Sequence, residues 1–143
     1  DIWAVDVNVY GPAVASSGSW SVGIDAAQYF NTRRVLGTDA TGHFITFTTQ
    51  LQAGTWTMAF FYRIGTQNPI LDIALSTDGT NWTNVRTGLD TYAATPAVGI
   101  DTTTGIVLTG SGRYWVRVTV NGKHASSSGH YAAFNRIQFV RTA

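Results

Sequence analysis

The feature that most constrains the fold is a strict alternation of apolar and polar residues in short segments. It is clearest in residues 111–123, SGRYWVRVTVNGK, where an apolar residue takes every second position from Tyr114 to Val120. Successive side chains of a β-strand point to opposite faces, so this spacing predicts a strand with one buried face. The Asn-Gly pair after Val120 is typical of a tight turn that ends such a strand.

The opposite face of this predicted strand is unusual for a surface in contact with solvent. It places Trp115 between Arg113 and Arg117, where Thr, Ser or Lys would be ordinary. We expect Trp115 to point away from the interior, either toward a ligand or against a further segment of the protein.

Similar alternation predicts strands along the rest of the chain, separated by turn-forming residues. The predicted strands cover residues 2–10, 43–51, 55–64, 70–76, 105–109, 113–120 and 134–141, with one more after Trp82. Residues 11–22 and 87–104 are expected to be loops, and residues 23–42 to contain a helical turn or an irregular strand. The strands near the two ends of the chain should pair or lie close together.

The composition also favours sheets. The 143 residues include 21 Thr and 18 aromatic residues, but only one Met, one Lys and no Glu. β-Branched and aromatic residues favour strands, whereas the long polar residues that favour helices are nearly absent. We therefore predict an all-β fold, a two-sheet antiparallel jelly-roll β-sandwich in which residues 1–143 form a single domain.

Charge and hydropathy exclude several classes of protein. The formal net charge of +1 is too small to attract nucleic acid by release of counterions. No apolar run reaches the roughly 18 residues of a membrane helix, so we expect no membrane insertion. The absence of Cys excludes disulfides and thiolate metal ligands. Because the sequence begins at Asp1 rather than Met, we expect a processed protein or a fragment cut from a longer one. The expected location is extracellular or on a virion or cell surface.

We expect no catalytic activity. The eight Asp residues are scattered over turns, loops and polar strand faces, and no spacing brings two of them into one site. The sequence contains no nucleophile elbow, zinc-protease helix or phosphate-binding glycine loop. His43, His124 and His130 have no metal-ligand spacing and are expected on the surface.

Calcium is the one cofactor that the sequence leaves open, since oxygen ligands from loop Asp and Asn residues suit a hard cation. The candidate ligands are Asp78, Asn81, Asp101 and Asn135. The alternative is that these residues only form tight turns, because short Asp and Asn side chains tolerate left-handed backbone geometry.

Aromatic residues beside hydrogen-bonding groups are the strongest indication of a binding site. The C–H faces of sugars stack on flat aromatic rings, while their hydroxyls need amide, carboxylate or guanidinium partners. The candidate ligand-binding residues are Trp115, Arg113 and Arg117 on the outward strand face, and Trp20, Tyr29, Tyr92 and Tyr131 in predicted loops. The alternative for Trp115 is that residues 87–104 or 23–42 cover it.

Four motifs follow one another in the later part of the chain. They are an AGTWT turn and strand at 53–57, an Asp-Gly turn at 78–79, a strand after a glycine-rich turn at 112–120, and AFNRIQF at 133–139. In this order they resemble the family-6-type carbohydrate-binding modules, which belong to the galactose-binding-like β-sandwiches. The resemblance implies a jelly roll that binds carbohydrate.

The chain departs from the pattern of that family at two positions. A position that is often a ligand-binding Asn in the family is Ala133, and the acidic position that helps to hold structural calcium is Asn135. The resemblance covers residues 42–141 and concerns the topology more than the chemistry of the sites.

These observations predict a non-catalytic recognition module that binds carbohydrate or a host-surface glycan. Similar sandwiches also occur as appended domains of bacteriophage structural proteins, and Phe61 with Arg63 forms a second outward aromatic-Arg pair. Protein interfaces are enriched in Arg and aromatic residues and depleted of Lys and Glu. The alternative function is therefore a structural or assembly domain that contacts copies of itself or other virion proteins.

Overall fold

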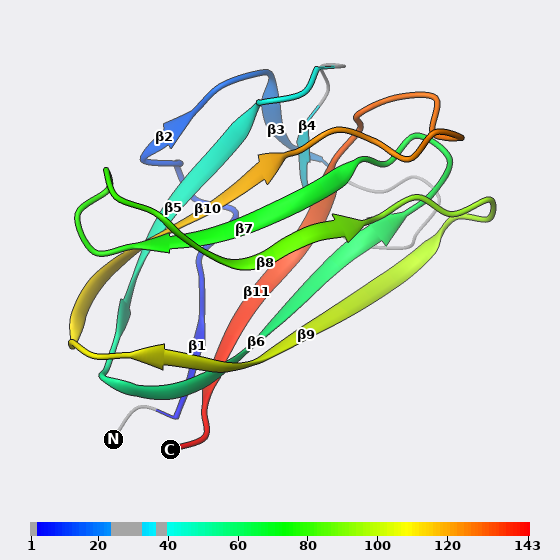
Figure 1. Ribbon diagram of the computed structural model, residues 1–143. Helices are drawn as coiled ribbons and strands as arrows, with labels where there is room; N and C mark the ends of the chain where they lie inside the picture. Colours follow the sequence, from blue (N-terminus) through cyan, green and yellow to red (C-terminus); the bar gives the residue numbers. More distant parts are fainter. Residues whose placement is uncertain (1–2, 24–32, 37–39) are drawn as a thin grey trace.

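The computed structural model describes residues 3–23, 33–36 and 40–143. All regular elements in this part of the chain are β-strands, and they form two sheets that pack face to face (Figure 1). The predicted all-β sandwich is therefore confirmed. No described segment is a helix long and apolar enough to cross a membrane.

The described strands are divided between a six-stranded and a five-stranded sheet, with antiparallel pairing between neighbours. The strands are β1 (Ala4–Asp6), β2 (Ala15–Ser16), β3 (Trp20–Gly23), β4 (Arg33–Leu36), β5 (Phe44–Leu51), β6 (Gly54–Ile64), β7 (Ile70–Ser76), β8 (Thr83–Asp90), β9 (Ala97–Leu108), β10 (Gly112–Val120) and β11 (Ala133–Arg141). The six-stranded sheet has the order β3-β4-β11-β6-β9, and β1 also pairs with β11. The five-stranded sheet has the order β2-β5-β10-β7-β8.

The hydrophobic core lies between the sheets and is built from alternate residues of their central strands. Every second residue is buried from Trp56 to Tyr62 in β6 and from Tyr114 to Val120 in β10. Phe134 of β11 packs in this core against Phe60, with ring centroids 5.4 Å apart. At roughly 25 cal/mol per Å² of apolar surface, burial of one large side chain stabilises the fold by about 2–3 kcal/mol.

The strands nearest the two ends of the described chain pair with each other, as expected. β1 runs antiparallel to β11, with Ala4 opposite Val140. The first strand is shorter than the predicted 2–10 and ends at Asp6, although Val7 and Val9 continue the buried pattern.

Two segments predicted as loops contain strands, so those predictions are wrong. Residues 87–104 lie largely in β8 and β9, and β9 begins at Ala97 rather than at 105. Thr and Gly occupy many positions of β9, and much of this strand is exposed. Its two faces therefore differ little in polarity, and the sequence shows no clear alternation there. Residues 11–22 carry β2 and most of β3. Of the segment 23–42, residues 24–32 and 37–39 lie outside the described residues.

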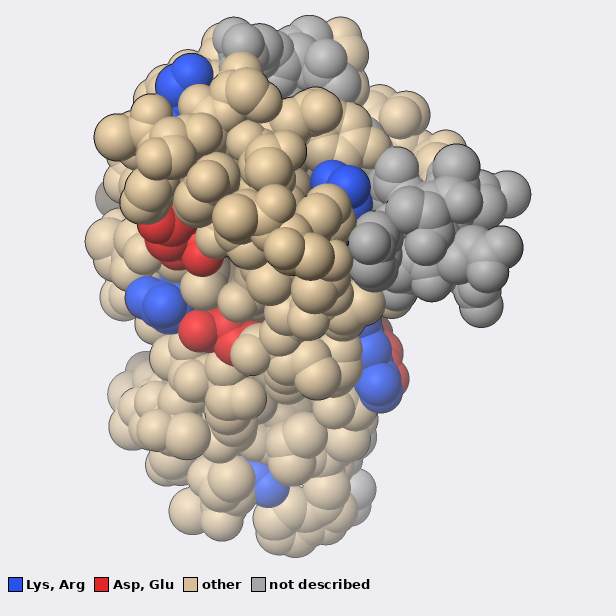
Figure 2. Space-filling view, turned by 90° about the vertical axis from the view of Figure 1, so that its right-hand side faces the viewer, with Lys and Arg blue, Asp and Glu red and all other residues tan. Residues whose placement is uncertain are grey.

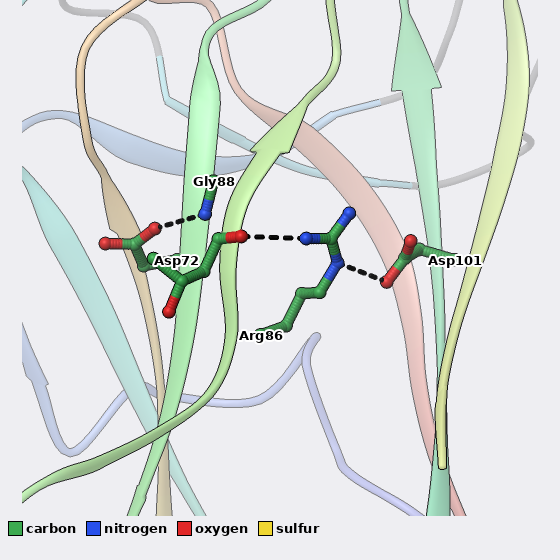
Figure 3. A network of polar contacts seen from close by, with 5 residues as sticks. Asp72, Arg86, Gly88 and Asp101 are labelled. Atoms are coloured by element: carbon green, nitrogen blue, oxygen red, sulfur yellow. Dashed lines mark hydrogen bonds and ion pairs between the residues drawn. The ribbon is translucent and has the colours of Figure 1, made fainter.

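β8 and β9 are edge strands of opposite sheets and run side by side at one flank of the sandwich (Figure 1). An ion pair joins them, because Arg86 Nε donates to Asp101 Oδ2 at 3.0 Å (Figure 3). Arg86 Nη1 also donates to the carbonyl of Thr87 at 2.7 Å, and Asp72 of β7 accepts a hydrogen bond from Gly88 N–H at 2.8 Å. The Arg86–Asp101 pair joins the edges of the two sheets, whereas the other two contacts lie within the five-stranded sheet and fix β8 and the Arg86 side chain.

The face shown in Figure 2 has no continuous surface of one charge. Basic and acidic side chains lie there in small separate groups on a mostly uncharged surface. The composition agrees with this picture, since only 12% of the residues are charged. The described residues of this face therefore form no basic stripe of the kind that is typical of a nucleic-acid-binding face.

Candidate functional site

The outward face of the five-stranded sheet carries the residues that the alternation identified. In β10, Tyr114 is buried, Trp115 and Arg117 are half-buried, and Arg113 is exposed. Tyr114 therefore points inward and Trp115 outward, as predicted. The hydroxyl of Tyr114 donates a hydrogen bond to the carbonyl of Gly110 at 2.7 Å and so anchors the turn between β9 and β10.

The indole of Trp115 lies against the turn between β7 and β8. A Cβ atom on Gly79 would lie 3.2 Å from both Nε1 and Cε2 of the indole, which is closer than side chains ordinarily pack. Gly79 also has a φ of +77°, a conformation that other residues rarely adopt. Part of Trp115 is thus covered by this turn. Residues 87–104, one of the expected covers, lie largely in β8, which β7 separates from β10, and in β9 of the other sheet.

Asp78 organises the hydrogen bonds of that turn. Its carboxylate accepts hydrogen bonds from the backbone N–H groups of Thr80 and Asn81, the Asn81 amide and the Ser76 hydroxyl, at 2.8–2.9 Å. These donors, led by the Asn81 N–H, hold the pKa of Asp78 well below its ordinary value. The turn is therefore fixed in the conformation that places Gly79 on the indole.

Arg117 contacts two aromatic rings on the same outward face. Its guanidinium carbon lies 4.0 Å from the ring centroid of Phe44 and 4.2 Å from that of Trp82. Its Nε donates a hydrogen bond to Thr46 Oγ1 at 2.9 Å. Burial lowers the pKa of Arg117 from its ordinary value, but arginine keeps its charge at neutral pH. The cation–π contacts and the hydrogen bond hold this charge in one orientation.

Arg113 lies on the other side of Trp115, with its guanidinium carbon 5.8 Å from the indole centroid. The ion pairs of the described residues join Arg86 to Asp101 and Arg136 to Asp6. Within the described part of the chain, Arg113 and Arg117 therefore have no carboxylate partner.

Two adjoining hollows open at this end of the sandwich, between the β7–β8 turn and the β9–β10 turn. The first has a volume of about 380 Å³ and is lined by Thr77, Thr109, Gly110, Ser111, Gly112, Arg113, Tyr114 and Trp115. The second has a volume of about 340 Å³ and is lined by Leu75, Ser76, Thr77, Asn81, Trp82, Thr83, Val85, Ile106, Val107, Leu108, Thr109 and Tyr114. Both volumes lie in the range of small-molecule sites. Each hollow has one indole in its wall.

The other aromatic candidates do not join this site. Trp20 lies on β3 and packs against the core, with its ring 6.1 Å from that of Phe134 and its Nε1 donating to the Ser17 carbonyl at 2.9 Å. The prediction that Trp20 lies in a loop is therefore wrong. Its packing against the core accounts for an aromatic residue at this position.

Tyr92 and Tyr131 lie near the opposite end of the sandwich. The ring of Tyr92 stacks on that of His124 with centroids 4.6 Å apart and planes 4° from parallel, so no sugar fits between the two rings. The backbone N–H of half-buried Tyr131 donates to the Gln67 carbonyl at 2.8 Å. Tyr29 lies outside the described residues.

The four candidate calcium ligands do not form one site. Asp78 and Asn81 bind each other within their turn, and Asp101 is paired with Arg86. Asn135 lies on β11 of the six-stranded sheet, and its buried Oδ1 has no hydrogen-bond partner among the described residues. Nowhere in the described ranges are three or more His or Asp side chains placed to hold a metal. These four residues therefore do not fit a single calcium site, and turn chemistry accounts for Asp78 and Asn81.

Sequence reasoning missed Trp82, Phe44 and Gly79 as parts of this surface. Trp82 directly follows the turn-forming sequence Asp-Gly-Thr-Asn. This is the one feature of the sequence that indicates an indole at the edge of the sheet. Phe44 becomes a neighbour of Arg117 only through strand register, in which Phe44 pairs with Thr119.

The fold is the β-sandwich found in carbohydrate-binding modules. The sequence matches no protein-family model and no curated protein. The chain is similar to part of a xanthan lyase from Paenibacillus, with a TM-score of 0.78 and 21% identity over 95% of this chain. The match spans 13% of the length of that enzyme.

Two isolated modules are also similar to this chain. One is a family 61 carbohydrate-binding module in complex with β-1,4-galactotriose, with a TM-score of 0.62 and 15% identity over 93% of this chain and 90% of the other. The other is a family 36 module in complex with calcium and xylotriose, with a TM-score of 0.52 and 12% identity over 99% and 100%. At these identities the similarity establishes the fold.

Proposed function

We propose that this protein is a non-catalytic module that binds carbohydrate at the end of the five-stranded sheet where Trp115 lies. One observation carries the proposal: half-buried Trp115 stands in the wall of a hollow of about 380 Å³ whose remaining lining is mostly hydroxyl and glycine residues. The indole offers a flat surface to the C–H face of a sugar. Thr77, Thr109 and Ser111 offer hydrogen bonds to its hydroxyls.

The neighbouring hollow favours a ligand of more than one sugar unit. It contains Trp82 and shares Thr77, Thr109 and Tyr114 with the first hollow. A chain that crosses both hollows meets one indole in each. Because the hollows are open, we expect affinities for short oligosaccharides on the order of micromolar to millimolar.

Similar structures support this proposal. Two of them were solved with a bound galactotriose or xylotriose, and another is part of a much larger xanthan lyase. We propose that this chain likewise serves as a module attached to a glycan-active enzyme, outside the cell where polysaccharides lie.

The described carboxylates support a non-catalytic role. Asp78 is engaged by four donors in its turn, and Asp101 by Arg86. Glycoside hydrolysis needs two carboxylates across one bond, roughly 5–10 Å apart in a shared site. The walls of the two hollows contain no carboxylate among their described residues.

Affinity electrophoresis and titration calorimetry against a panel of soluble polysaccharides test the proposal. We expect one or more of them to retard the protein, and we expect Trp115→Ala to weaken this binding at least tenfold. Trp3→Ala is the matched control, because Trp3 is 55% exposed and lies beside β1 in the other sheet. Binding by no polysaccharide, or equal loss in both variants, would refute the proposed site.

The assembly alternative rests on the outward face of the six-stranded sheet. Phe61 is half-buried there beneath Arg136, whose guanidinium carbon lies 5.3 Å from its ring centroid, but the neighbouring Ile100 is 60% exposed. Sedimentation equilibrium separates the two functions. A monomer supports the carbohydrate-binding module, whereas a stable oligomer that dissociates in Ile100→Asp supports assembly.

A further inference from the structure

We infer that the ligand of this surface is an acidic polysaccharide whose anionic groups are held by Arg113 and Arg117. The inference rests on the proposed function and narrows it to one class of glycan. Three observations support it: the placement of the two guanidinium groups, their N–H donors that have no partner in the described chain, and the hydrogen bonds that the nearby carboxylates form with other groups.

The two arginines lie on either side of the proposed stacking surface. Arg113, Trp115 and Arg117 alternate with buried residues along β10, so their side chains leave the same face of the sheet. A strand rises about 3.3 Å per residue, which places the two arginine Cα atoms about 13 Å apart with the indole midway. A sugar stacked on Trp115 therefore has a cation on each side along the strand.

The two guanidinium groups on this face can only donate hydrogen bonds. Arg117 uses only its Nε within the described chain, so Nη1 and Nη2 remain to donate to a ligand. Arg113 forms a contact with the indole but no hydrogen bond with the described residues. Sugar hydroxyls both donate and accept, whereas a carboxylate or sulfate only accepts, and a guanidinium group binds such anions in a bidentate manner. The arginines thus match the anionic group better than a neutral sugar.

The acidic residues near this face form no ion pair with the two arginines in the described part of the chain. In the adjoining turn, the Asp78 carboxylate accepts hydrogen bonds from Ser76, Thr80 and Asn81. At the far end of the face, Asp72 accepts hydrogen bonds from Gly88 N–H and Asn121 Nδ2. Both carboxylates are therefore occupied by donors other than the two arginines.

The side chain of Arg117 is also pre-organised in the absence of a ligand. The rings of Phe44 and Trp82 and the hydroxyl of Thr46 already fix its side chain. Because the Arg117 side chain is already held in place, little conformational entropy is lost when an anion binds. The guanidinium group therefore binds the anion more tightly than a mobile one would.

The experiment compares polysaccharides that differ only in charge. Polygalacturonate is paired with its methyl ester and dextran sulfate with dextran, so that carboxylate and sulfate are tested separately. Binding of the 143-residue chain is measured by affinity electrophoresis and calorimetry at several salt concentrations. We expect at least one acidic polymer to bind at least tenfold more tightly than its neutral partner, with affinity falling as salt rises.

Arginine variants locate the charge effect. Arg113→Gln and Arg117→Gln should each weaken binding to the acidic polymer about tenfold and leave the neutral polymer unaffected. Lys123→Gln is the matched control, because it removes one exposed charge near the far end of β10 and should change the affinity less than twofold. Near-ultraviolet circular dichroism checks folding, and exposed Arg113 supplies the test if Arg117→Gln fails to fold.

The outcomes separate this inference from the proposed function. Equal binding of charged and neutral polymers, lost in Trp115→Ala, overturns the acidic ligand but leaves carbohydrate binding intact. An equal effect of Lys123→Gln and Arg113→Gln also overturns the inference, because the attraction then comes from net charge. Failure of every polymer to bind overturns both proposals.

Discussion

Gly79 and the indole of Trp115 are in such close contact that a methyl group on residue 79 would lie 3.2 Å from two ring atoms. The turn and the indole are therefore a single packed unit, in which the turn sets the position of the ring. This unit is what makes Trp115 a fixed surface rather than a mobile side chain.

Gly79→Ala should both destabilise the protein and displace the indole. The left-handed backbone costs about 1–2 kcal/mol for a residue with a Cβ atom, and the contact with Trp115 adds to it. Gly88→Ala is the control, since Gly88 has a similar φ of +68° but nothing within 4 Å of its Cβ position. Urea unfolding should show a greater loss for Gly79→Ala, and iodide quenching should show a changed exposure of Trp115. Equal losses without a change in quenching would contradict this packing.

Asp101→Asn should weaken the contact between the two sheet edges. The Arg86 and Asp101 side chains are 32% and 18% exposed, so loss of the charge leaves a partly buried guanidinium group without its partner. We expect a loss of about 1 kcal/mol in the free energy of unfolding. Asp6→Asn breaks the ion pair between Asp6 and Arg136, in which the Asp6 side chain is 55% exposed and the Arg136 side chain 45%. This change should cost less than about 0.5 kcal/mol. The reverse order would show that Arg86 and Asp101 do not hold the edges together.

Asn68→Ala should be among the more damaging single changes in the loops. Asn68 is fully buried, and its Nδ2 donates to the carbonyls of Arg63 and Tyr131 at 3.0 and 2.9 Å. Loss of these bonds leaves two partly buried carbonyls without their donor, at a cost of about 2–4 kcal/mol. Exposed Asn84→Ala should change the stability by less than about 0.5 kcal/mol. Denaturant unfolding of the two variants measures the difference, and similar values would show that the Asn68 bonds add little.

Asp78 should make the stability fall in acid. Its pKa is lowered in the folded protein from an ordinary value of 3.8, so the ionised carboxylate stabilises the fold above that pH. This stabilisation is lost as the pH falls below about 4 toward the lower pKa of the folded state. Asp78→Asn should therefore lower the melting temperature at pH 7 and flatten its decline between pH 4 and pH 2. Parallel melting curves for the two proteins over this range would contradict the role given to Asp78.

The fold was predictable where two faces of a strand differ strongly. In β10, buried valines alternate with Trp115 and the arginines, so the period of two predicts both the strand and its orientation. In β9 the contrast is weak, because an edge strand with Thr and Gly at many positions has little apolar surface to alternate. Its place is set by pairing with β6, for example Asp101 opposite Phe60, which local sequence does not reveal.

The candidate site was also predictable only in part, because local sequence does not reveal which strands pair. Trp115, Arg113 and Arg117 lie on one strand, so their common face follows from spacing alone. Trp82 and Phe44 come from other parts of the chain and meet Arg117 through strand register and a turn. Trp20 was misplaced because a Ser-rich context resembles a loop, although its ring packs on the core.

The ion pair between β8 and β9 also bears on solubility. Edge strands expose unpaired amide groups that recruit strands from other molecules, and charged side chains turned toward the interior discourage such pairing. Asp101 and Arg86 place opposite charges across the gap between two such edges. A variant that lacks this bridge should therefore form fibrils or precipitates at concentrations where the parent protein stays dispersed.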